Sequence, residues 1–441
     1  MSKGKLRQDT KAQLIQRILG KKGDSSASGD VLPARRTLSY SEVPEAYYRF
    51  DRHPAYERML VSKAAADRIG IENPFFRVHD GVSASTSRID GREYINFSSY
   101  NYLGLAGHPA VNKAAKEAID RYGTSASASR LVAGEREVQR ELERELAENY
   151  EVEDCVVFVS GHATNVSTIG SLFGPKDLVI HDALVHNSVL EGVRLSGSAR
   201  RSFPHNNHKM LDQILSEIRG QFERALIVVE GHYSMDGDIP DLPALIEIKK
   251  RHKVFLMVDE AHSLGVLGDT GKGLHEHFGV EGKDVDIWMG TLSKTLAASG
   301  GYIAGERALV EQLKYSAPGF VYSVGISPVL AAASLAALKI MNEEPERVSR
   351  LRERGHLFLN TARELAVDTG LSAGYSIVPA IVGGSLKATR LSLKLFDLGI
   401  NVQPIIYPAV EERSARLRFF ISSTHSEQQV TTALQALRRA I

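Results

Sequence analysis

The chain has 441 residues, 43% of them hydrophobic, and a formal net charge of +1 at pH 7. This composition is ordinary for a globular protein with one large core or two moderate ones, and the near-neutral charge gives no reason to expect a nucleic-acid partner. No apolar run reaches the roughly 18 residues needed for a membrane span, and the first residues lack the apolar stretch of a secretory signal, so we expect a cytoplasmic protein. The single cysteine, Cys155, cannot form an internal disulfide and is interpreted as a small core residue.

Residues 1–40 contain a short amphipathic stretch, Leu14–Leu19, followed by the polar tract KKGDSSASGD. Because such a tract cannot bury enough apolar surface to fold alone, we predict a mobile N-terminal extension. Residues 41–106 follow as a segment with one or two helices between Ala46 and Ile71 and a hairpin turn at Asp90-Gly91.

Apolar runs alternate with helical stretches through residues 107–328. Four of these runs have the length of buried strands: Asp154–Ser160, Leu178–Asp182, Ala225–Glu230 and Val254–Val258. The alternation predicts an α/β fold, a parallel sheet with crossover helices. The fourth run is followed by Asp259, Glu260 and His262, and the C-terminal edge of a parallel sheet is where ligands bind.

One lysine, Lys294, lies among small and hydroxyl-bearing residues, with Gly290 and Thr291 before it and Gly300-Gly301 after it. Burial at such a place lowers the pKa of a lysine and frees a neutral amine. A neutral amine attacks aldehydes. From this stretch alone, a solvated lysine in a Ser/Thr turn is an equal alternative.

The motifs VDEAHS (Val258–Ser263) and GTLSKT (Gly290–Thr295) resemble those of the α-oxoamine synthase family of fold-type I pyridoxal-phosphate enzymes. The similarity extends from about Tyr94 to His425. It implies a large domain, here residues 107–328, with a mostly parallel seven-stranded sheet and helices on both faces, and a smaller α+β C-terminal domain, residues 329–441. It also implies pyridoxal 5′-phosphate as the cofactor and no metal.

The resemblance assigns catalytic roles to four residues. It implies that Lys294 holds the cofactor as a Schiff base, that Asp259 pairs with the pyridine nitrogen, and that His262 hydrogen-bonds the ring hydroxyl. A carboxylate beside the ring nitrogen keeps it protonated, so that the ring can take up negative charge. His186 lies at the place of the family histidine that stacks on the ring, and an imidazole can also shuttle a proton.

Further cofactor contacts are implied for Gly161, His162, Ser234 and Thr291. A helix is expected to begin at Gly161 and His162, directly after a strand, and its free backbone amides and positive dipole end suit a phosphate. The family commonly has Phe or Tyr where His162 stands, so we expect the amide contact here without the aromatic residue.

The segment VYSVGISP, Val321–Pro328, implies a homodimer with composite active sites, because related enzymes contribute this segment to the partner's cofactor. Related enzymes commonly have Thr-Ser where Val324-Gly325 stands, and valine cannot donate a hydrogen bond to a phosphate. Ser323 is the candidate replacement.

Three residues are candidates for substrate binding. Arg418 matches the second arginine of the family's Arg-Leu-Arg strand and is implied to bind the amino acid's carboxylate bidentately, whereas Arg416 is expected to be exposed on an edge strand. Tyr100 and Asn101 belong to SSYNYLGL, Ser98–Leu105, which leads into the active site. Its Tyr-Asn-Tyr form resembles serine palmitoyltransferases and synthases of secondary metabolism, while biotin-pathway members usually have asparagine in place of Tyr100.

These residues together predict the decarboxylative condensation of glycine, alanine or serine with an acyl thioester, giving an α-amino ketone. The acyl group could be carried by coenzyme A or by a carrier protein. Basic groups in residues 1–40 are a candidate docking surface for an acidic carrier, with a functionless tail as an equal alternative.

Two other functions stay open. An aldolase or aminotransferase of the same fold would need no acyl donor. A non-catalytic partner subunit is the third possibility, and the presence of Lys294, Asp259 and His262 argues against it.

Overall fold

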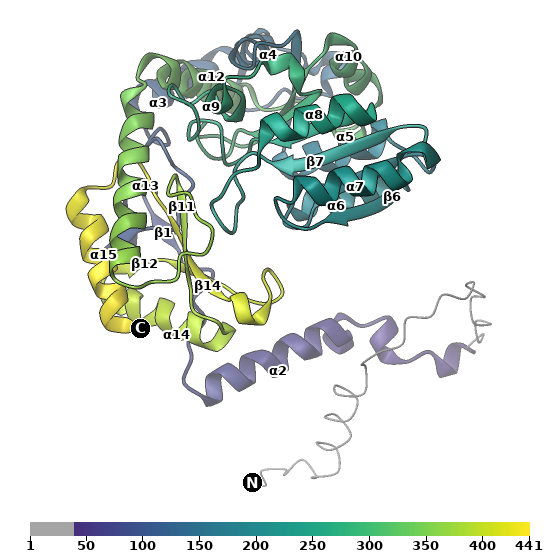
Figure 1. Cartoon of the computed structure of the whole chain (residues 1–441). Helices are drawn as coiled ribbons and strands as arrows, with labels where there is room; N and C mark the ends of the chain where they lie inside the picture. Colours follow the sequence, from purple (N-terminus) through teal and green to yellow (C-terminus); the bar gives the residue numbers. More distant parts are fainter. Residues whose placement is uncertain (1–38) are drawn as a thin grey trace. The chain divides into compact units, whose positions relative to one another are not determined.

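The computed structural model describes residues 39–441, in two compact units that divide after Gly70 (Figure 1). The described part of the first unit consists of three short 3₁₀ turns and one helix: η1 (Tyr40–Glu42), η2 (Glu45–Tyr47), η3 (Phe50–Arg52) and α2 (Pro54–Arg68). Helical structure is therefore present between Ala46 and Ile71, as predicted. The extension predicted for residues 1–40, with its stretch Leu14–Leu19, lies almost entirely outside the described residues.

The second unit is built on a seven-stranded sheet. Its strands lie in the order β4 (Asp154–Phe158), β10 (Gly301–Gly305), β9 (Ile287–Thr291), β8 (Phe255–Asp259), β7 (Ala225–Glu230), β5 (Leu178–Asp182) and β6 (Ala199–Phe203). All neighbours pair in parallel except β10, which is antiparallel to both β4 and β9. The predicted mostly parallel seven-stranded sheet is confirmed.

Helices cover both faces of this sheet, as expected from strands that are apolar throughout. In β7, Leu226 and Val228 belong to one apolar cluster, whereas Ile227 and Val229 belong to the other. The first cluster includes residues of α5 (Gly161–Leu172), α6 (Asn187–Ser196), α10 (Arg307–Ser316) and α11 (Pro318–Val321). The second includes residues of α3 (Pro109–Tyr122), α4 (Glu137–Asn149), α7 (His208–Ile218), α8 (Leu242–His252), α9 (Leu274–Phe278) and α12 (Pro328–Glu343).

Two smaller sheets complete the second unit. One has three strands in the order β11 (Ile377–Ile381), β14 (Arg416–Phe420) and β13 (Gln403–Ile405); the other has four in the order β1 (His79–Asp80), β2 (Thr86–Ile89), β3 (Arg92–Asn96) and β12 (Ile400–Asn401). Three helices lie beside them in Figure 1: α13 (Glu346–Glu364), α14 (Ser385–Asp397) and α15 (Glu427–Ala440). Short helical turns occur at η4 (Arg130–Gly134), η5 (Arg219–Gln221), η6 (Gly282–Asp284) and η7 (Glu412–Ser414).

The hairpin predicted at Asp90-Gly91 joins β2 to β3. Both turn residues have positive φ, 49° at Asp90 and 78° at Gly91, as a two-residue hairpin loop requires. β3 also pairs in parallel with β12. This pairing connects the segment before the large sheet to the C-terminal part of the chain.

Candidate active site

A cavity of about 550 Å³ lies at the C-terminal ends of β7, β8 and β9 and the loops that follow them. Its lining includes every predicted site residue except Asn101 and Ser323. It also includes residues that the sequence analysis did not assign to the site, among them Asn165, Ser188, Glu230 and Met235. The predicted site is therefore one continuous cavity to which several strand ends contribute.

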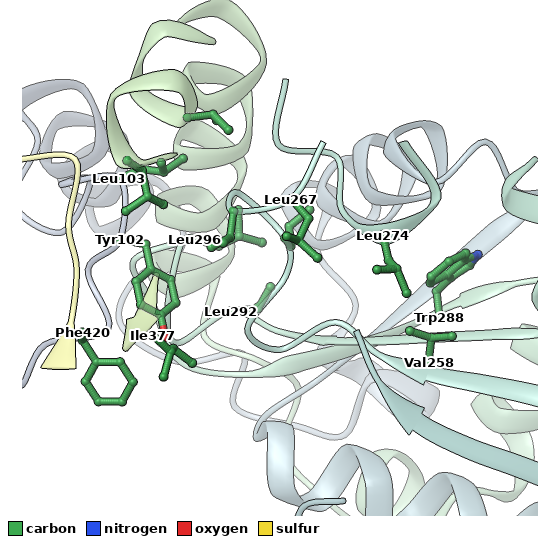
Figure 2. Packing of buried hydrophobic residues seen from close by; sticks show 14 of the residues in the cluster. Tyr102, Leu103, Val258, Leu267, Leu274, Trp288, Leu292, Leu296, Ile377 and Phe420 are labelled. Atoms are coloured by element: carbon green, nitrogen blue, oxygen red, sulfur yellow. The ribbon is translucent and has the colours of Figure 1, made fainter. Parts of the chain in front are cut away.

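The loop that carries Lys294 is anchored in the core on both sides of the lysine. Leu292 and Leu296 are fully buried, and Figure 2 shows them in the same packed cluster as Tyr102 and Leu267. The Thr295 hydroxyl donates to the Leu264 carbonyl at 2.7 Å. Because these neighbours are held in the core, Lys294 is fixed in the lining of the cavity.

Burial lowers the pKa of Lys294 to about 8; Arg418 acts in the same direction, while Asp259 and Glu230 oppose the shift. Its Nζ lies 5.6 Å from the centre of the Tyr100 ring. The structure thus favours the desolvated lysine over the solvated one, because an ordinary lysine would keep its proton to a much higher pH.

Asp259 ends β8 and is buried, with 4% of its surface exposed. Its Oδ2 accepts a hydrogen bond from Asn165 Nδ2 at 2.9 Å, and its Oδ1 accepts from the Ala261 amide at 3.0 Å. Asn165 Nδ2 also donates to the Ser188 hydroxyl at 2.9 Å. Hydrogen bonds of this kind favour the charged form of a carboxyl group. Asn165 lies one helical turn after Gly161 on α5, so the two residues share one face of the helix. This spacing could have predicted from the sequence that Asn165 belongs to the site.

Two of the histidines that line the cavity, His262 and His186, have lowered pKa values. His262 Nδ1 lies 2.7 Å from the Tyr102 hydroxyl, and burial, followed by the charges of Lys294 and Arg418, holds the pKa of this imidazole well below its usual value. His186 is the N-cap of α6, where its Nδ1 accepts from the Ser188 amide at 3.3 Å. Burial also lowers the pKa of His186.

The N-terminus of α5 forms the part of the cavity expected to bind a phosphate. The helix begins at Gly161, after the N-cap Ser160. A Cβ at Gly161 would lie only 2.9 Å from Thr291 Oγ1, and that hydroxyl donates to the Gly300 carbonyl at 2.9 Å. Glycine therefore allows the first amides of α5 to lie close to β9, where free backbone amides can bind an anion.

Arg418 lies on β14, and its Nη1 donates to the Ser234 carbonyl at 3.0 Å. Its Nε is buried without a hydrogen-bond partner among the described residues. A buried unpaired donor on a guanidinium is costly unless a ligand accepts from it. Arg418 therefore has hydrogen-bonding capacity that a substrate carboxylate could use, and its role in binding that carboxylate stays a prediction.

The expectation for Arg416 was wrong. This residue is buried, at 5% exposure, and β14 is the central strand of its sheet rather than an edge strand. Arg416 Nη1 donates to Asp236 Oδ1 at 2.6 Å and to the Met235 carbonyl at 3.1 Å. It therefore joins β14 to the loop that follows β7.

Two predicted site residues lie outside the cavity lining. The side-chain amide of Asn101 is hydrogen-bonded within the chain: Nδ2 donates to the carbonyls of Ser83 and Ala106, and Oδ1 accepts from the Ala106 amide. In this single chain the structure thus gives Asn101 a structural contact rather than a substrate contact. Ser323 is partly exposed in the segment after α11, away from the cavity of its own chain.

Within residues 39–441, no group of three or more acidic, histidine or cysteine side chains is arranged to hold a metal. In the same range, no helix combines the length and the apolar character that a bilayer span requires.

The fold and the lysine-centred cavity define a fold-type I pyridoxal-phosphate enzyme. The family model described as aminotransferase class I and II matches residues 92–437. The chain is 42% identical over 353 residues to the 8-amino-7-oxononanoate synthase of Symbiobacterium thermophilum, covering 80% of this chain and 90% of that protein. It is 40% identical over 362 residues to the protein of the same name from Geobacter sulfurreducens, covering 81% of this chain and 92% of that protein.

Solved structures agree with this assignment. Serine palmitoyltransferase from Sphingomonas wittichii superimposes with a TM-score of 0.84 at 28% identity, covering 88% of this chain and 97% of that one. The 8-amino-7-oxononanoate synthase from Francisella tularensis superimposes with a TM-score of 0.67 at 25% identity. The match covers 78% of this chain and 97% of that chain. The chain belongs to the aminotransferase class I and II family and, within it, to the α-oxoamine synthases, which are pyridoxal-phosphate-dependent acyltransferases.

The cavity residues fit the cofactor. A buried carboxylate, Asp259, suits a protonated ring nitrogen, the amides at Gly161 suit a phosphate, and Lys294 suits an aldehyde. The volume of about 550 Å³ is ordinary for a small-molecule site. Within the described range, residues 39–441, Arg418 Nε and Asn165 Oδ1 are buried without a hydrogen-bond partner, which leaves hydrogen-bonding capacity for a ligand.

Proposed function

We propose that this chain joins the α-carbon of alanine to the acyl carbon of a thioester, releasing carbon dioxide and free thiol and giving an α-amino ketone. The observation that carries this proposal is the placement of Lys294 and Arg418 in one cavity. The arginine can bind the carboxylate of an amino acid, and the lysine can remove its α-proton.

The names of the relatives support alanine as the amino acid. The product 8-amino-7-oxononanoate is itself an α-amino ketone. Dividing it between the ketone carbon and the amino-bearing carbon gives the skeleton of alanine without its carboxyl group and the acyl group of a seven-carbon dicarboxylic acid. We therefore propose this acyl group as the first candidate donor.

Pyridoxal phosphate, when bound, supplies an aldehyde that takes up an amino group and a ring that accepts the electron pair left at the α-carbon. The chain's own residues do the rest. Arg418 binds the substrate carboxylate, and Lys294 Nζ, with its pKa lowered to about 8, accepts the α-proton. Asp259, whose two oxygens accept hydrogen bonds from Asn165 and Ala261, would pair with the ring nitrogen of the bound cofactor.

The overall reaction balances without an oxidant. A carbon–carbon bond forms between the α-carbon and the acyl carbon, and the carbon–sulfur bond of the thioester breaks. The thiolate leaves and takes up a proton. The bond to the carboxyl group breaks, carbon dioxide leaves, and a proton returns to the α-carbon.

Serine with a long acyl chain is the second candidate, favoured by the serine palmitoyltransferase structures and by Tyr100. This tyrosine lines the cavity and is 40% exposed, so it can contact a substrate.

The two candidates are separated by supplying alanine, serine and glycine with seven-carbon dicarboxylic and palmitoyl thioesters, each carried on coenzyme A or on a carrier protein, and weighing the ketone by mass spectrometry. We expect alanine and the dicarboxylic acyl group to give the highest kcat/KM. A preference for serine and palmitoyl donors would replace the first candidate with the second. Repeating the comparison without residues 1–40 tests the proposed carrier docking. Equal kcat/KM values for the coenzyme A and carrier-protein donors, with and without these residues, would rule it out.

We further propose a homodimer with composite active sites. The end of α11 and the segment after it are bound to the loop before α4, since the Ser129 hydroxyl donates to the Val321 carbonyl and the Gly325 amide donates to the Ala128 carbonyl. Large apolar side chains are exposed on both, including Val132 at 82% and Tyr322 at 87%. Such surface is typical of a protein interface. Sedimentation should give the mass of a dimer, and an active monomer at low concentration would contradict the proposal.

A further inference from the structure

Two carboxyl groups stand side by side in the active site. Glu230 is the last residue of β7 and Asp259 the last of β8, and they are direct partners in the register of these parallel strands. Both are buried, with 3% and 4% of their surfaces exposed, and both line the cavity. Like charges so placed disfavour each other, so one of the two groups should retain a proton.

Their surroundings are unequal. Asp259 accepts two hydrogen bonds, which stabilise an anion. Glu230 accepts one, from the Ser234 amide to Oε2 at 3.0 Å, and its Oε1 is buried without a hydrogen-bond partner within residues 39–441. The backbone of His186 also faces this carboxyl but does not reach hydrogen-bond geometry. The proton therefore belongs on Glu230.

We propose that Glu230 is the uncharged member of this pair and acts as a positioning residue for the amino-acid substrate. Its Oε2 holds the amide of Ser234, and the carbonyl of Ser234 accepts from Arg418 Nη1. Glu230 thereby fixes the guanidinium through one intermediate residue. Because Glu230 is neutral, it adds no second negative charge to that of Asp259 near the place where the substrate carboxylate binds.

The electrostatics agree with this geometry. Burial, followed by the charge of Asp259, raises the pKa of Glu230 to about 8, against the opposing effects of the Ser234 amide and Lys294. The other titratable or charged groups in the cavity lining are Tyr100, His162, His186, His262 and Arg418. Glu230 is therefore mainly uncharged below pH 8. The affinity of the site for the substrate carboxylate should fall as the pH rises through that value.

The proton can be observed directly. The infrared difference spectrum between the full-length holoenzyme and its Glu230→Gln variant should contain the band of a protonated carboxylic acid at pH 7. This band should be lost as the pH is raised through the pKa of Glu230, about 8. Carboxylate bands alone at pH 7 would overturn the proposal. Because this measurement needs no turnover, its outcome is independent of the proposed function on which the substrate role rests.

Kinetics provides the second readout. In the wild type, the KM for the amino acid should rise about fivefold or more between pH 7 and pH 9, since a new negative charge would repel the carboxylate. Glu230→Gln cannot ionise, so this rise should be reduced to what Lys294 alone contributes. Glu230→Ala leaves the Ser234 amide unpaired and should lose about 10- to 100-fold in kcat/KM, with partial rescue in Glu230→Gln. A Gln variant as impaired as the Ala variant would show that the charged carboxylate is required and would overturn the proposal.

Discussion

The Lys294→Ala protein is expected to lose covalent attachment of pyridoxal phosphate and at least about 10³-fold in turnover, because both the nucleophilic amine and the proton acceptor are removed. Among residues 39–441, Lys294 is the only lysine in the lining of the cavity. Its two core anchors, Leu292 and Leu296, are unchanged in the variant, so the fold should be retained.

The measurement is the intact mass after borohydride reduction. The wild type should gain the mass of one reduced cofactor, and Lys294→Ala should gain none. Lys283→Ala is a suitable control, because this lysine is highly exposed and forms an ion pair with Glu281 at the surface. A reduced adduct in the Lys294→Ala protein would place the cofactor on another lysine.

Asp259→Asn should reduce turnover by about 10²- to 10³-fold, because a neutral amide cannot hold the charge of a protonated ring nitrogen. The substitution keeps the size of the side chain, and the Ala261 amide can still donate to the remaining oxygen. The melting temperature should therefore change little while kcat falls.

The exposed carboxylate Asp269, paired with Arg352 at the surface, offers a matched control as Asp269→Asn. Turnover in Asp259→Asn close to that of the control would show that Asp259 has only a structural role.

The sequence was most informative where chemistry and local structure coincide. Apolar runs that end in polar residues predicted β7 and β8, and the motifs around Asp259 and Lys294 predicted their meeting in one cavity. These predictions depend on the period of the strands and on the common edge of a parallel sheet. Neither requires knowledge of how distant segments pair.

What the sequence did not predict depends on pairing. The register that sets Glu230 beside Asp259 is a property of two strands together, and nothing in either strand specifies it. The central position of β14, which buries Arg416, likewise depends on β11 and β13 pairing on its two sides. A motif can also lie at the site while one of its residues is outside the cavity lining. Asn101 is such a residue, because its side-chain amide is hydrogen-bonded to Ser83 and Ala106.

The measurement that tests the central claim most directly is the release of carbon dioxide from carboxyl-labelled alanine, with and without an acyl thioester. The account predicts release that depends on the thioester, with one free thiol and one amino ketone formed for each carbon dioxide, and none in Lys294→Ala. Release without a thioester, or conversion of alanine to its oxo acid with no thiol formed, would contradict it and assign the chain to another reaction of this fold.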